Sequence, residues 1–115
     1  MKRLLLLFTA LVLSHVATAN TLPQDEDGLI KAKAKELTTK YGTELGLDAD
    51  QLKTFEQTLT GYMLKKAKVG KLNVSETDKM VMLKQLTSQE NEDMEAMLSK
   101  TQYKNYLKTK TKLQP

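Results

Sequence analysis

Apolar side chains recur every three or four residues along most of the chain from Leu29 onward. This spacing places them on one face of an α-helix, and no stretch alternates as a half-buried β-strand would. The pattern falls into four stretches, and it predicts an all-α fold of four helices joined by short turns in an elongated hairpin. The apolar positions are Ile30, Ala34, Leu37, Tyr41 and Leu45, then Leu52, Phe55, Leu59, Tyr62 or Met63, and Val69, then Met80, Leu83, Leu86, Met94 and Met97, and finally Tyr103, Tyr106 and Leu107.

Local signals indicate where the predicted helices begin and end. Two sites have the spacing of a capping box, in which the cap residue and a glutamine three positions later bond each other's backbone amides. A leucine precedes each cap, so the same arrangement occurs twice, 51 residues apart. Gly46 and Gly70 fit helix ends, which gives a second helix over 49–69. The helix-capping residues are Leu47, Asp48, Gln51, Leu98, Ser99 and Gln102.

Residues 1–19 have the pattern of a secretory signal peptide. Lys2 and Arg3 precede an apolar run from Leu4 to Leu13, and small residues end the segment at Ala19. The run is shorter than the roughly 20 residues that span a bilayer. We therefore expect cleavage after Ala19, a polar leader over 20–28 and a single helical domain over 29–115. The expected location is the periplasm, with secretion as the alternative.

The composition removes most catalytic chemistries. The sequence has no Cys and no Trp, and its only Arg and His lie in the predicted signal peptide as Arg3 and His15. The remaining chain lacks a Cys nucleophile, a His general base and the residues of a Cys/His zinc site, so we expect neither an enzyme nor a cofactor. The net charge of +4, part of which belongs to the signal, is too small to indicate nucleic-acid binding or attraction to a membrane.

The segments Leu47-Asp48-Ala49-Asp50-Gln51 and Leu98-Ser99-Lys100-Thr101-Gln102 resemble the LTxxQ motifs of the Spy/CpxP family of small periplasmic helical proteins. Asp and Ser stand where the family has Thr, and all three residue types cap helices. The resemblance extends over roughly residues 29–113. It implies helical hairpins in a thin, cupped, antiparallel homodimer. It also implies an ATP-independent chaperone or an envelope-stress regulator that binds a sensor domain.

Methionine and lysine supply the candidate binding residues. Flexible thioethers suit a surface that accepts varied apolar partners, although they also fill ordinary cores. Met80 and Met97 are expected to be core residues, whereas Met82 lies off the main apolar stripe and Met63 stands beside Tyr62. Lysines near the end of the second helix would surround such a surface, or form an ordinary solvated face. The candidate client-binding residues are Met63, Met82, Lys65, Lys66 and Lys68.

Glu90 occupies a position of the third helix where the stripe expects an apolar residue. It belongs to an acidic run with Glu92, Asp93 and Glu95, which is the one candidate for a hard-cation site, although the turn of a calcium loop is missing. The alternative is that Glu90 pairs with a lysine across the hairpin. We favour the ion pair and expect no bound metal.

Three functional hypotheses follow from these features. The first is a non-enzymatic, exported holdase that keeps unfolded envelope proteins from aggregating. The alternative is a regulatory or structural envelope protein with one dedicated protein partner. A third hypothesis, a peripheral membrane-binding protein, rests on the lysines alone. The thin core that so few apolar residues provide also favours pairing with a second copy.

Overall fold

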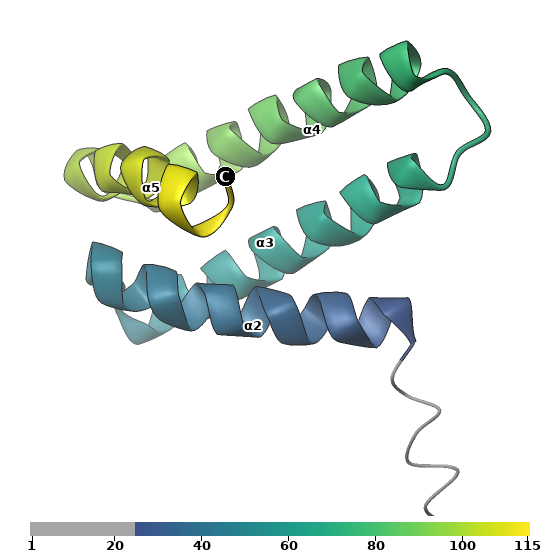
Figure 1. The fold of residues 1–115 in the computed structure, drawn as a ribbon. Coiled ribbons are helices and arrows are strands. Elements are labelled where there is room, and N and C mark those ends of the chain that lie inside the picture. Colours follow the sequence, from purple (N-terminus) through teal and green to yellow (C-terminus); the bar gives the residue numbers. More distant parts are fainter. Residues whose placement is uncertain (1–24) are drawn as a thin grey trace, which may run out of the picture.

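A computed structural model describes residues 25–115 and contains four helices (Figure 1). They are α2 (Glu26–Leu45), α3 (Ala49–Gly70), α4 (Glu76–Met97) and α5 (Lys100–Leu113). Residues 25–115 include no strand, so the predicted all-α fold of four helices joined by short turns is confirmed. The predicted signal peptide and the first part of the polar leader lie outside the described residues. None of the described helices is long and apolar enough to cross a membrane.

Each helix begins at a polar cap. The Asp25 side chain accepts a hydrogen bond of 2.8 Å from the backbone amide of Gly28, so α2 starts at Glu26, three residues before the predicted Leu29. Acidic side chains stabilise the positive end of a helix, and Glu26 and Asp27 therefore belong to the first turn rather than to a leader. Gly46 ends α2 with a φ of 65°, the left-handed conformation that glycine adopts readily.

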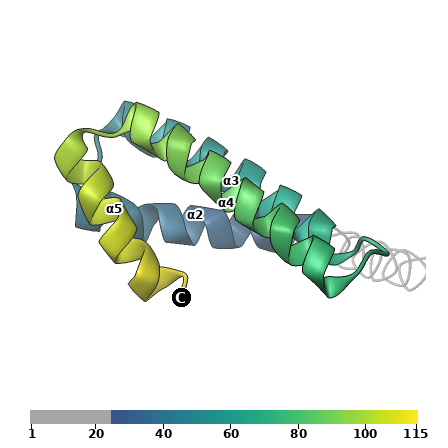
Figure 2. The same cartoon turned by 90° about the horizontal axis from the view of Figure 1, so that it is seen from above.

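The helices form a layer with α3 between α2 and α4 (Figure 1). The turns that join α2 to α3 and α4 to α5 lie at one end, and the α3–α4 turn lies at the other. α5 folds back from the shared end and contacts both α2 and α4, running obliquely to α2 (Figure 2). No contact joins α2 to α4 within residues 25–115, so α5 closes that end of the layer.

The core is a small aromatic and aliphatic cluster beneath α5. The rings of Tyr41, Phe55 and Tyr106 are all buried, and their centroids lie 5.0 to 5.9 Å apart in tilted or edge-on arrangements. Leu59 and Met94 complete the centre of the cluster. The apolar stripes predicted for α2 and α3 therefore supply most of the core.

The stripe predicted for α4 is wrong at Met80, whereas Leu83 and Leu86 are half-buried. Met80 is 59% exposed, although it was expected in the core, whereas Met97 packs against the core as expected. The reason is the length of α5, which has 14 residues against 22 in α4 and covers only the far end of that helix. Leu107 of α5, also placed on an inward stripe, is exposed as well.

Candidate protein-binding surface

The two capping boxes meet at the shared end of the layer. Both form completely, because each cap side chain accepts from the glutamine's backbone amide and each glutamine accepts from the cap's backbone amide. The side-chain amide of Gln51 donates to Oε1 of Gln102 at 2.8 Å, and the side-chain amide of Gln102 donates to Oε1 of Gln51 at 3.2 Å. The six motif residues are therefore structural: Asp48 and Ser99 cap their own helices, Gln51 and Gln102 join the two helix starts, and the two leucines pack with the core.

The repeat extends from these boxes into the core. Phe55 follows the Asp48 cap by the same number of residues as Tyr106 follows the Ser99 cap, and the two rings contact each other with centroids 5.9 Å apart. The helices also pair reciprocally, since α3 contacts α4 and α2 contacts α5. The chain is thus two helix–box–helix units facing each other, the second with a shorter final helix.

Most of the large apolar side chains that face solvent gather at the opposite end, around the α3–α4 turn. We call these five residues the apolar tip: Leu72, Val74, Met80, Val81 and Met82. Sequence reasoning identified only Met82 among them. The run Met80-Val81-Met82 was the available signal, because three consecutive apolar residues on a helix span too wide an arc to face a single neighbour. The tip is the principal exposed apolar surface of the described chain.

The predicted client-binding residues divide between this surface and the interior. Met82 lies on the apolar tip, whereas Met63 packs against the core. Lys65 and Lys68 are exposed on α3, and the Lys65 ammonium lies 5.0 Å from the centre of the Tyr62 ring. Lys66 turns inward to an ion pair with Glu90. The structure therefore brings together Met82, Lys65 and Lys68 as surface residues near the α3–α4 end, and it removes Met63 and Lys66 from that group.

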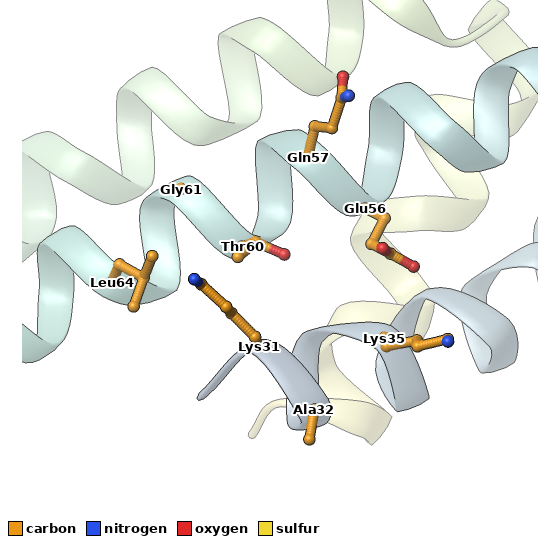
Figure 3. A pocket seen from close by; sticks show the side chains of 8 residues that line it. All are labelled: Lys31, Ala32, Lys35, Glu56, Gln57, Thr60, Gly61 and Leu64. Carbon is orange, nitrogen blue, oxygen red and sulfur yellow. The ribbon is translucent and has the colours of Figure 1, made fainter. Parts of the chain in front are cut away.

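A second surface feature is a groove between α2 and α3. A hollow of about 570 Å³ is lined by the α2 residues Lys31, Ala32 and Lys35 and by α3 residues that include Thr60, Gly61 and Leu64. Figure 3 shows the Lys31 side chain reaching from α2 toward Thr60 and Leu64. Sequence reasoning gave no sign of this groove, because its lining comes from the faces of α2 and α3 that had been interpreted as solvated.

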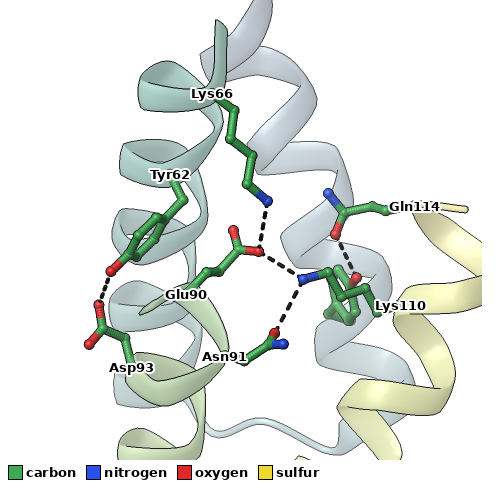
Figure 4. A network of polar contacts seen from close by, with 8 residues as sticks. Tyr62, Lys66, Glu90, Asn91, Asp93, Lys110 and Gln114 are labelled. Atoms are coloured by element: carbon green, nitrogen blue, oxygen red, sulfur yellow. Dashed lines mark hydrogen bonds and ion pairs between the residues drawn. The ribbon is translucent and has the colours of Figure 1, made fainter. Parts of the chain in front are cut away.

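The most buried charge is Glu90, which the structure places between three helices (Figure 4). Its Oε1 accepts from Lys66 of α3 at 3.2 Å and from Lys110 of α5 at 2.9 Å, while Lys110 also donates to Asn91 at 3.2 Å. The predicted pairing of Glu90 with a lysine across the hairpin is confirmed. The second oxygen, Oε2, is buried without a hydrogen-bond partner within residues 25–115.

The other acids of the run point to different partners. Asp93 accepts a hydrogen bond of 2.5 Å from the Tyr62 hydroxyl, and Glu92 and Glu95 are exposed. No group of three or more acidic or histidine side chains converges as a metal site within residues 25–115. The run therefore contributes to helix packing in two places, through Glu90 and Asp93.

The Tyr62–Asp93 hydrogen bond predicts an alkaline loss of stability. This bond, followed by burial, raises the pKa of Tyr62 from 10.0 to about 12. Between those values the unfolded chain releases the proton while the folded protein retains it, so stability falls as pH rises. We expect Tyr62→Phe to be less stable than wild type near neutral pH, and the difference to shrink between about pH 10 and pH 12. Chemical denaturation of both proteins across that range measures the difference in their free energies of unfolding. A difference that stays constant with pH would contradict the role given to the Tyr62–Asp93 hydrogen bond.

Comparison of the chain with protein-family models, with curated proteins and with solved structures found no match.

Proposed function

We propose that this chain is an exported, non-enzymatic protein of the cell envelope that holds unfolded or aggregation-prone proteins at its apolar tip without ATP. One observation carries the proposal. Five large apolar side chains are exposed within one turn and the first part of one helix, where α5 does not reach. Large apolar side chains that are exposed close together are typical of interaction sites, whereas singly scattered ones are ordinary.

The chemistry of the tip suits broad and weak recognition. Met80 and Met82 have unbranched, adaptable side chains that fit differently shaped apolar partners. Lys65, Lys68 and Lys84 are exposed on the flanking helices and would attract acidic segments of a client. A shallow surface of this kind has no pocket shaped for a single ligand, which is why we favour a holdase over a protein with one dedicated partner.

The test is suppression of aggregation. A test protein diluted from denaturant is followed by light scattering with increasing amounts of the chain, at low and moderate salt. The wild type is expected to reduce scattering, and the Met80→Ser/Val81→Ser/Met82→Ser variant to need at least about tenfold more protein for the same effect. Because these side chains face solvent, the variant should unfold at nearly the wild-type temperature.

The matched control is Leu107→Ser, which removes an exposed apolar side chain from α5, the helix that does not reach the tip, and should suppress aggregation as the wild type does. Equal activity of the tip variant and the wild type would refute the assignment to the tip. Failure of the wild type at every ratio would refute the holdase and leave the dedicated-partner alternative, to be sought by crosslinking in the envelope.

A further inference from the structure

Two glycines lie in the interiors of helices, and only one is explained by packing. A Cβ atom added at Gly42 of α2 would lie 2.6 Å from Cδ2 of Leu52, so this glycine lets α2 and α3 approach closely. A Cβ atom at Gly61 of α3 would meet nothing within 4 Å. Glycine weakens a helix interior relative to almost any other residue. Gly61 therefore costs helix stability without serving the packing of residues 25–115.

Gly61 is one of the residues that line the α2–α3 groove, and its lack of a side chain leaves that part of the lining open (Figure 3). A second hollow of about 530 Å³ continues the groove toward the α2–α3 turn, sharing Lys35, Glu56 and Gln57 with the first and reaching Leu52. From Leu52 to Leu64 the groove follows α3 for about 18 Å, at 1.5 Å per residue. A helix of about 12 residues has this length.

The lining favours a helix as the occupant. An extended peptide would need backbone hydrogen-bond partners, and the groove walls are helices whose backbone groups already bond each other. A helix satisfies its own backbone, and small residues such as Ala32 and Gly61 let a neighbouring helix come close. The apolar side chains in the lining are Ala32, Leu52 and Leu64, which the apolar face of a short amphipathic helix would contact.

The charges along the groove favour acidic residues on either side of the apolar face of that helix. Lys31, Lys35 and Lys53 line it, and none of the three forms an ion pair with another of the described residues. Glu56 is the one acidic side chain in the lining. Acidic side chains beside the apolar face would meet this excess of positive charge.

We propose that the α2–α3 groove is a docking site for a short amphipathic helix of a partner protein, with an apolar face and acidic flanks. The site is separate from the apolar tip, and the proposal does not depend on the holdase function. Recognition of one helical segment here would give the chain a defined partner in addition to varied clients.

The test uses the protein expressed from its full sequence and a stapled, fluorescein-labelled peptide with leucines on one face and glutamates beside them. A second peptide carries lysines in place of the glutamates. Fluorescence anisotropy at low salt should show the acidic peptide binding at least about tenfold more tightly than the basic one. Gly61→Met adds a large side chain to the lining of the groove and should weaken binding of the acidic peptide by about tenfold or more.

Gly61→Met distinguishes a blocked site from a damaged fold, because a methionine in a helix interior should raise the unfolding temperature above that of wild type. Gly70→Met is the matched control: it changes the same residue type on the same helix, at a position outside the groove with open space around it. It should bind the peptide as wild type does, and so should the tip variant.

Three results would overturn the proposal. They are equal affinity for the acidic and basic peptides, unchanged affinity in Gly61→Met, and a shift from dimer to monomer on sedimentation of Gly61→Met. The last would assign the groove to a second copy of this chain. Loss of aggregation suppression in the tip variant with intact peptide binding would separate this proposal from the proposed function.

Discussion

Exchanging Lys66 and Lys110 together for methionine is expected to lower the free energy of unfolding by about 3–5 kcal/mol. Both lysines donate to the same oxygen of Glu90, whose side chain is 1% exposed. Removing both leaves a buried carboxylate with no opposite charge and no access to water. Guanidinium denaturation followed by circular dichroism measures the loss, and a change below about 1 kcal/mol would contradict the role assigned to the two lysines.

Removing the carboxylate instead of the two lysines should have a different effect on stability. In Glu90→Met the buried charge and its unpartnered Oε2 both disappear. Lys66 and Lys110 are left without the carboxylate, but their side chains are 26% and 18% exposed, so their ammonium groups can reach water along their flexible stems. We expect this variant to be as stable as wild type or more stable, and to rescue the double lysine variant when combined with it.

This asymmetry suggests what the ion pairs contribute to the fold. A buried pair is weak evidence for stability, but its geometry can select one arrangement of helices over another. Glu90 on α4 accepts from α3 and from α5, and α5 has few other contacts with α4. The Tyr41 hydroxyl similarly donates to Gln114 at 2.6 Å, just after α5 ends. Polar contacts thus fix where a short helix lies.

The sequence predicted the helices well because their ends depend on local signals. Asp48, Ser99 and Gly46 act within a few residues of themselves, and the structure places α3 one residue beyond the predicted 49–69. The start of α2 was missed because three consecutive acids suit both a leader and a first turn. Local chemistry could not choose between them.

Tertiary features were predicted only where one residue was out of pattern. Glu90 interrupted an apolar stripe, which was sufficient to infer a lysine partner, although not the second one from α5. The exposure of Met80 depends on how far α5 reaches, and the pairing of Gln51 with Gln102 depends on two turns meeting in space. Neither follows from periodicity along one helix. The repeat 51 residues apart was the only sequence signal that the turns are related.

Truncating Phe55 to alanine is expected to cost about 3–5 kcal/mol, a large fraction of the stability that a domain of this size has. Phe55 is fully buried and contacts the rings of both Tyr41 and Tyr106, so it joins α3 to α2 and to α5. With so few aromatic side chains in the core, the cavity has no large neighbour free to fill it. Thermal unfolding followed by circular dichroism should show a large drop in the midpoint.

Tyr106→Phe is the matched control for this prediction. It keeps the second ring of the repeat and removes a buried hydroxyl that has no partner among residues 25–115. Deleting an unsatisfied polar group removes a desolvation penalty, so this variant should equal or exceed the wild type in stability. If Phe55→Ala lost less than about 1 kcal/mol, the aromatic cluster would not be the centre of the fold, and polar contacts would be the main attachment of α5.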